Sequence, residues 1–306
     1  MNKKIISVAL AIFFIGGGFF FSKVTEKKEL PCTKVVEKIS EPEKNISVAE
    51  AAEENLFLGM DSSVKNILND GSEYAVYIAY PQKSQTPYLY NSKKMRSASM
   101  IKVFILATAM ELVKDGNLSL DQPMTINAYN KVGGSGILAG YPTGSQLTMR
   151  EVLRMMIIHS DNTATNMMID LLGMSTVNEY LQMKGYTDTI LQRKMMDFNG
   201  KENYTSARDL GNFFLNLYNL QEVGSAYDQL MLEFLKDQTD TECFNAACPD
   251  KIIAHKTGAL AGLFDDGGII FGGKNGDTVL ILMTENFTGE KIVIGRMKKF
   301  AQNLIY

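Results

Sequence analysis

The order of the predicted secondary-structure elements is the feature of this sequence that most limits its fold. Short β-rich segments predict two strands, at 75–80 and 88–90, and further strands follow only after residue 250. Apolar periodicity predicts helices between these two groups. One sheet is therefore expected to form from both ends of the domain, with the helical block inserted between them. The late strands are expected at 252–257, 268–271 and 278–283, and the helices at 61–68, 99–114, 152–157, 163–172, 176–184, 207–219 and 289–304.

Composition and spacing exclude several classes of protein. The chain has 306 residues, 45% of them hydrophobic, which is enough for one sizeable core or two smaller cores that share an interface. A net charge of -3 provides no basic patch for nucleic acid. The two histidines, His159 and His255, match no zinc-binding spacing, and no G-x-x-x-x-G-K-[ST] phosphate loop occurs. No metal, cofactor or nucleic-acid partner is therefore expected.

The N-terminal part is expected to place the rest of the chain outside the cytoplasm. Two lysines precede an apolar run at 5–21, which favours residues 1–22 as a membrane anchor with its N-terminus inside. A cleaved signal peptide is the alternative. Residues 23–55 are charged and poor in aromatic side chains, as in a stalk or linker. We expect an extracytoplasmic protein, anchored to the cell membrane by its N-terminus or secreted, with a catalytic domain at 56–306.

A serine and a lysine three residues apart open a predicted helix that is mostly apolar. Residues three apart lie on the same face of a helix, so the Ser99 hydroxyl and the Lys102 amine can meet. Burial and the positive end of the helix dipole both favour a neutral amine, which can accept the proton of the serine. Ser99 is therefore the candidate nucleophile and Lys102 its base.

Two further short motifs follow in order, Ser-Asp-Asn at 160–162 and Lys-Thr-Gly at 256–258. The series S-x-x-K, S-D-N and K-T-G marks class A β-lactamases and penicillin-binding proteins. The segments at 132–136 and 156–157, before the second motif, match the same context. From about Ser62 to its C-terminus the chain resembles the class A serine β-lactamase family, within the larger group of penicillin-recognising serine enzymes.

This resemblance implies an α/β (α+β) fold. A five-stranded antiparallel sheet flanked by helices is expected, with an all-helical subdomain inserted at about residues 96–206. The active site is expected in the groove between the two parts. The expected partner is a small-molecule β-lactam or a peptidoglycan stem peptide, and the protein is expected to be a monomer.

The motifs indicate the roles of the candidate catalytic residues. Ser99 is expected to attack an amide carbonyl and form an acyl-enzyme, with Lys102 taking its proton directly or through water. Ser160 lies just past a predicted helix end and can deliver a proton to the leaving nitrogen. Asn162 offers an amide to the substrate and to Lys102, whereas the resemblance implies a structural role for Asp161.

A second group of residues is expected to bind the substrate. Lys256 and Thr257 would hold its carboxylate, and Gly258 would let the strand backbone approach closely. The resemblance implies an oxyanion hole made by the backbone N–H groups of Ala259 and Ser99. Neither histidine belongs to a motif, so both are interpreted as structural and no Ser-His-Asp triad is needed.

The loop that activates the deacylating water in this family departs from the usual pattern. Efficient members carry a glutamate four residues before an asparagine. Aligning Arg193 and Asn199 with the family's arginine and asparagine places Met195 at the glutamate position, and a thioether cannot accept a proton at neutral pH. Asp197 and Glu202 are the nearby carboxylates. The sequence therefore predicts that the acyl-enzyme can form, and it leaves open whether the acyl group is released efficiently.

Three functions remain compatible with the sequence. The first is a serine hydrolase of the class A β-lactamase family that opens β-lactam amides through an acyl-serine intermediate. The second is a D-Ala-D-Ala carboxypeptidase or transpeptidase of the penicillin-binding type. The third is a β-lactam-binding or sensor protein without turnover. The first is ranked highest because the match across the whole domain is to class A.

The pairing of the cysteines is left open by the sequence. Cys243 and Cys248 lie five residues apart in a polar loop, and an exported protein could join them in a disulfide. Two free thiols are the alternative. Cys32 would then be left over in the N-terminal tail.

Overall fold

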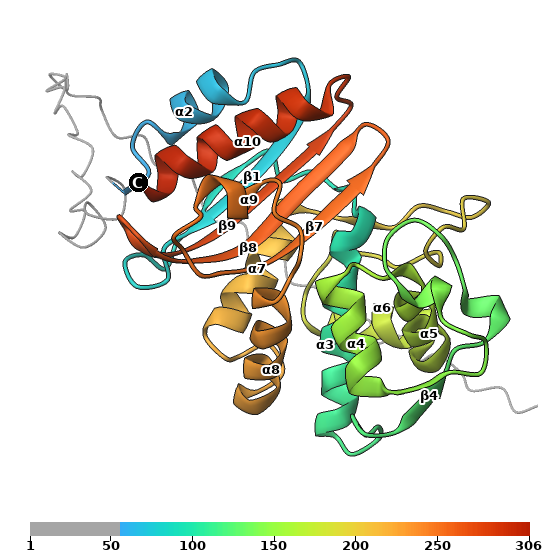
Figure 1. Cartoon of the computed structure of the whole chain (residues 1–306). Helices are drawn as coiled ribbons and strands as arrows, with labels where there is room; N and C mark the ends of the chain where they lie inside the picture. Colours follow the sequence, from blue (N-terminus) through green and yellow to red (C-terminus); the bar gives the residue numbers. More distant parts are fainter. Residues whose placement is uncertain (1–55) are drawn as a thin grey trace, which may run out of the picture. The chain divides into compact units, whose positions relative to one another are not determined.

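A five-stranded antiparallel sheet forms the centre of the computed structural model, which describes residues 56–306 (Figure 1). The strand order is β2-β1-β9-β8-β7, so the two early strands lie beside the three late ones. This confirms the expected α/β (α+β) fold, with one sheet built from both ends of the domain. The strands are β1 (Glu73–Ala79), β2 (Tyr88–Tyr90), β7 (Ile253–Leu260), β8 (Leu263–Gly273) and β9 (Gly276–Glu285).

Both faces of the sheet are apolar, as β1 illustrates. Successive side chains of a strand point to opposite faces. Tyr77 accordingly belongs to one buried cluster, whereas Val76 and Ile78 belong to another. Each face therefore needs a covering layer, and Figure 1 shows helices on both. The helices on the Val76 face are α2 (Met60–Ile67), α9 (Phe244–Ala247) and α10 (Glu290–Ile305), and α7 (Ala207–Tyr218) lies on the Tyr77 face.

The helical part of the domain surrounds α3 (Ile101–Lys114). The first ten residues of α3, Ile101 to Met110, are all buried, including Lys102. The remaining helices are α4 (Met149–Ile158), α5 (Asn162–Leu172), α6 (Met174–Met183) and α8 (Ser225–Lys236). Helix α8 contacts both α3 and α4, although it lies beyond residue 206, where the helical insertion was expected to end.

Short elements join the two parts. Strands β3 and β6 pair where the chain leaves the sheet and where it returns, so they bracket the helical insertion. The 3₁₀-helix η1 directly precedes α3 and carries Ser99. The short elements are β3 (Met95–Arg96) with β6 (Tyr204–Thr205), β4 (Pro123–Thr125) with β5 (Gln146–Thr148), η1 (Ala98–Met100), η2 (Ala128–Asn130) and η3 (Leu138–Gly140).

Two of the expected strand boundaries were wrong. β8 begins at Leu263 rather than near residue 268, and its early half contains Asp265 and Asp266. These carboxylates interrupt the apolar pattern, but both are buried and hydrogen-bonded inside the fold, so they do not end the strand. β7 likewise continues to Leu260, so the whole Lys-Thr-Gly motif lies within a strand.

Several expectations concern residues outside the described range, namely the anchor at 1–22, the linker at 23–55 and Cys32. Within residues 56–306, no helix is both long enough and apolar enough to cross a membrane. Cys243 and Cys248 are buried free thiols, so the structure shows the unpaired alternative.

Helix α7 lies so close to β1 that only glycine fits at residue 211. A Cβ atom added to Gly211 would lie 2.2 Å from the ring of Tyr77. By contrast, Gly295 in α10 is exposed, and an added Cβ would meet nothing within 4 Å. The two helical glycines therefore provide a matched test of the packing.

We predict that Gly211→Ala lowers the free energy of unfolding by about 1–3 kcal/mol or more, because the added methyl overpacks the contact with Tyr77. Gly295→Ala should raise the free energy of unfolding by about 0.5–1 kcal/mol, because alanine favours the helix. Urea denaturation measures both changes. Shifts of the same sign and size would contradict the close approach of α7 to β1.

Candidate active site

The turn that carries Ser99 is pressed against β7. A Cβ atom added to Gly258 would lie 3.1 Å from the Met100 side chain and 3.2 Å from that of Ala98, so glycine permits this approach. Ala98 has a φ of 40°, in the left-handed region that residues with side chains rarely adopt. Ser99 is only half-buried and therefore stays accessible at the start of α3.

Lys102 is fully buried, and its amine has three hydrogen-bond partners. Nζ donates to the carbonyl oxygen of Ser160 (2.5 Å), to Ser160 Oγ (3.1 Å) and to Asn162 Oδ1 (2.9 Å). The expected direct contact with the Ser99 hydroxyl is not among the hydrogen bonds of the described residues, and the amine instead contacts Ser160 and Asn162. Burial, together with the charge of Lys256, lowers the pKa of Lys102 well below its usual value.

Ser160 lies between the two buried lysines. Its Oγ accepts a hydrogen bond from Lys102 Nζ at 3.1 Å and another from Lys256 Nζ at 3.0 Å. Its φ of 50° places it in the left-handed region, as the chain turns from α4 into α5. The hydroxyl therefore connects the S-x-x-K motif with the K-T-G motif.

The other two residues of the Ser-Asp-Asn motif hold this arrangement in place. Asp161 caps α5 by accepting from the backbone N–H of Ala164 at 2.8 Å. Its second oxygen accepts from the N–H groups of Ile137 and Leu138 at 2.6 and 2.7 Å. Asn162 Nδ2 donates to the carbonyl oxygen of residue 133 at 3.0 Å. Asp161 therefore shapes the neighbouring loop and is buried away from the cavity.

Lys256 is fully buried on β7. Besides Ser160, its Nζ donates to the carbonyl oxygen of Thr257 at 2.7 Å. Burial lowers the pKa of Lys256 to about 8, although the charges of Asp240 and Asp266 partly oppose this effect. Lys256 therefore remains largely protonated near neutral pH.

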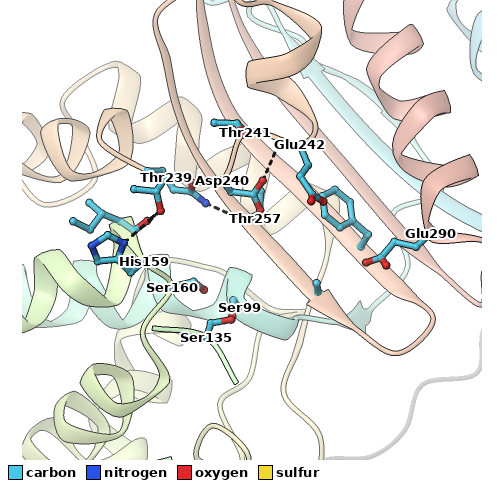
Figure 2. Close-up of a pocket in the computed structure, with 14 residues that line it drawn as sticks. Ser99, Ser135, His159, Ser160, Thr239, Asp240, Thr241, Glu242, Thr257 and Glu290 are labelled. Atoms are coloured by element: carbon cyan, nitrogen blue, oxygen red, sulfur yellow. Dashed lines mark hydrogen bonds between the residues drawn. The ribbon is translucent and has the colours of Figure 1, made fainter. Parts of the chain in front are cut away.

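A cavity of about 440 Å³ opens beside Ser99 (Figure 2). Ser160, Thr257 and Ala259 line it together with Ser99. The figure labels both serines among the side chains that line the cavity. The cavity is also lined by Ser135, His159, Gln238, Thr239, Asp240, Thr241, Glu242 and Glu290. The structure thus brings all residues expected from the three motifs to one place.

A smaller cavity of about 120 Å³ is also lined by Ser99, and its lining mixes polar and apolar side chains. Met195, Met196 and Phe198 line it, and among the described residues no carboxylate does. Glu202 instead forms an ion pair with Arg193 at 2.6 Å. Asp197 is the other carboxylate near the expected glutamate position, and its Oδ1 accepts a hydrogen bond from the backbone N–H of residue 199. Neither carboxylate considered as a substitute for the missing glutamate lines this cavity.

The histidines take no part in a catalytic triad within residues 56–306. His255 is buried, with Nδ1 2.8 Å from Asp266 Oδ1 and Nε2 3.2 Å from Asn245 Nδ2. His159 lines the larger cavity, and its Nδ1 lies 3.4 Å from Thr239 Oγ1. The same part of the chain contains no group of three or more His, Cys, Asp or Glu side chains that could hold a metal ion.

A loop at 238–242 lines the larger cavity and was missed by the sequence analysis. Gln238 Nε2 donates to Thr257 Oγ1 at 2.9 Å. No sequence motif marks Gln238, because it lies in an irregular loop that approaches Thr257 only in the folded structure. Only the folded structure identifies it as a neighbour of the K-T-G motif.

Comparison with known proteins agrees with the fold and with the three motifs. A family model described as the beta-lactamase enzyme family matches residues 60–304. The chain belongs to this family. The resemblance inferred from the motifs is thus confirmed, and the protein is an enzyme of a family of serine hydrolases.

Individual relatives are distant in sequence. A beta-lactamase from Streptomyces fradiae is 28% identical over 204 residues, which cover 62% of this chain and 66% of that protein. Beta-lactamase VEB-1 from Pseudomonas aeruginosa is 22% identical over 243 residues, or 74% of this chain and 80% of the relative. The structure of a beta-lactamase from Sphaerobacter thermophilus matches with a TM-score of 0.75 and 25% identity, covering 80% of this chain and 95% of the other. PBP-A shares the fold with a TM-score of 0.74 at 24% identity, covering 81% and 94%.

We predict that Asp161→Ala lowers the free energy of unfolding by about 2–4 kcal/mol, because it removes a helix cap and leaves two further backbone N–H groups without their acceptor. Asp237→Ala is the matched control, since Asp237 forms only an exposed ion pair with Arg154 and its loss should cost at most about 1 kcal/mol. Urea denaturation provides the comparison. Equal losses would show that Asp161 has no special structural role.

Proposed function

We propose that the protein opens β-lactam amides through an acyl-serine intermediate on Ser99 and releases the acyl group slowly. The single observation that carries this proposal is the position of Ser160 Oγ, which lies within hydrogen-bond distance of both Lys102 Nζ and Lys256 Nζ. A hydroxyl shared by two buried amines beside a nucleophile can relay a proton. A serine that only capped a helix would not require hydrogen bonds from two buried lysine amines.

In the proposed acylation step, Ser99 Oγ attacks the carbonyl carbon of the β-lactam. Its proton passes to the neutral amine of Lys102, directly or through water. The bond between the carbonyl carbon and the ring nitrogen then breaks, and the nitrogen takes the proton of Ser160 Oγ. Lys102 then gives the proton to Ser160. Both residues return to their starting protonation states, and the acyl group remains on Ser99.

The remaining motif residues are assigned to substrate binding. Lys256 and Thr257 would hold the substrate carboxylate, and the protonated state of Lys256 near neutral pH suits this role. Asn162, which already contacts Lys102, would offer its amide to the substrate. The backbone N–H groups of Ala259 and Ser99 would form the oxyanion hole.

Slow release of the acyl group is proposed because no carboxylate among residues 56–306 lines the smaller cavity, where the attacking water would be activated. Met195 lines the smaller cavity beside Ser99 and cannot accept a proton. Its backbone is held by Asn166, whose Oδ1 accepts from the N–H of Met195 at 2.8 Å. Loss of a general base typically slows the step it serves by about 10²–10⁴-fold.

A D-Ala-D-Ala carboxypeptidase or transpeptidase of the penicillin-binding type is the second candidate. The smaller cavity favours it, because no carboxylate of the described residues lines that cavity and an enzyme that does not hydrolyse β-lactams quickly has no need of one there. A variant of PBP-A has been solved as an acyl-enzyme complex with penicillin G, at 24% identity to this chain. Either function requires substrates outside the cell membrane, in line with the expected anchor, which stays a prediction.

We predict that benzylpenicillin adds its full mass to the purified chain and that Ser99→Ala takes up none, because Ser99 is the only proposed site of acylation. Intact-mass spectrometry over time measures both the formation and the lifetime of the adduct. The adduct should persist for minutes to hours. Folded wild-type protein without an adduct, or an adduct on Ser99→Ala, would overturn the proposal. Cleavage of a D-Ala-D-Ala peptide would favour the second candidate.

A second prediction concerns pH. Lys256 is protonated below its pKa of about 8 and loses its charge above it, so the attraction for a carboxylate weakens as pH rises through that value. The second-order rate of acylation by benzylpenicillin should therefore fall between about pH 7 and about pH 9.5. The neutral methyl ester of benzylpenicillin should not show this fall. Identical pH profiles for acid and ester would contradict the role of Lys256.

A further inference from the structure

Two neighbouring residues of the loop at 238–242 connect the two walls of the larger cavity. Thr239 donates to the carbonyl oxygen of Ile158 twice, from its N–H at 3.0 Å and from its Oγ1 at 2.8 Å. Ile158 ends α4, two residues before Ser160. Gln238 is bonded to Thr257 on β7, and Figure 2 draws this contact as a dashed line. The loop therefore joins the wall that carries Ser160 to the wall that carries Thr257.

The orientation of the Gln238 amide follows from its two partners. Its Oε1 accepts a hydrogen bond from the backbone N–H of Asp240. Because a backbone N–H can only donate, the amide oxygen must face Asp240 and the amide nitrogen must face Thr257. Gln238 is buried, with 6% of its surface exposed, so water does not compete freely for either group.

This orientation determines the direction of the Thr257 hydroxyl. Thr257 Oγ1 accepts a hydrogen bond from Gln238 Nε2 at 2.9 Å and has no other hydrogen-bond partner among residues 56–306. Its own hydrogen is then free to point away from Gln238. Thr257 lines the larger cavity together with Ser99 and Ser160. The hydroxyl is therefore available as a donor to a group bound there.

We infer that Gln238 is a positioning residue, which fixes the Thr257 hydroxyl as a hydrogen-bond donor to the carboxylate of the substrate. This inference rests on the proposed function, in which Thr257 and Lys256 bind that carboxylate. An ionised carboxylate can only accept hydrogen bonds, so a hydroxyl beside it is useful only when its hydrogen faces the cavity. Gln238 meets this requirement because its Nε2 donates to the oxygen of the Thr257 hydroxyl and offers no acceptor to the hydrogen of that hydroxyl.

Two variants of Gln238 separate the donor from the shape of the side chain. In Gln238→Glu, a carboxylate can still accept the N–H of Asp240, but it also accepts the hydrogen of Thr257 and turns it away from the cavity. The second-order rate of acylation by benzylpenicillin should fall by about 10- to 100-fold. Gln238→Met removes the donor without adding charge, and the rate should fall by about 2- to 10-fold.

A double-mutant cycle with Thr257→Val tests whether Gln238 acts through the hydroxyl. In the Thr257→Val background, Gln238→Met should change the acylation rate by less than about twofold, because the group that it positions is gone. The methyl ester of benzylpenicillin, which lacks the carboxylate, should also be insensitive to Gln238→Met. Asp237→Asn, at the exposed residue directly before the loop, is the control for general disturbance. Thermal melting by circular dichroism confirms that each variant is folded.

The outcomes distinguish the inference from the function on which it rests. Wild-type rates in Gln238→Met and Gln238→Glu would overturn the inference alone. The inference would also be overturned if Gln238→Met slowed acylation by benzylpenicillin and by its methyl ester equally, or slowed it as much in the Thr257→Val background as in the wild type. Either result would show that Gln238 has only a structural role. A folded wild-type chain that benzylpenicillin does not acylate would overturn the proposed function, and the inference with it.

Discussion

The contact of Ser160 Oγ with two buried amines is the interaction on which the rest of the site depends. Burying two lysines side by side is costly, because each loses its hydration and each disfavours the charge of the other. The fold offsets this cost with acceptors placed on three different elements, including Asn162 on α5 and the carbonyl oxygen of Thr257 on β7. The cap at Asp161 and the close packing at Gly258 position the walls on which those acceptors lie.

Around this contact the chemistry is divided between two cavities. The larger cavity is lined by Ser99, by Ser160 and, on its β7 wall, by Thr257, which are all assigned to the proposed acylation. The smaller cavity, where Met195 and Phe198 lie beside Ser99, holds no carboxylate among the described residues. In the proposed mechanism, the two halves of the reaction therefore differ: side chains are available for forming the acyl-enzyme, and no carboxylate of the described residues is available in the smaller cavity for the attack of water on it.

Much of this could be predicted from the sequence, because short motifs and apolar patterns are local signals. Ser99, Lys102 and the later motifs were found from spacing alone, and the sheet followed from the order of the strands. The early start of β8 could not be predicted, because Asp265 lies inside the fold where only tertiary contacts satisfy it. The contact of Gln238 with Thr257 was hidden for a similar reason, since an irregular loop makes it.

The measurement that tests the central claim most directly is the lifetime of the benzylpenicilloyl adduct in Met195→Glu and Met195→Gln. If a missing base limits deacylation, the glutamate should shorten the lifetime by about tenfold or more, because it can activate water in the smaller cavity. The glutamine, similar in shape but not a base, should leave the lifetime near that of the wild type. Equal lifetimes in all three proteins, or equal shortening by both substitutions, would contradict the account.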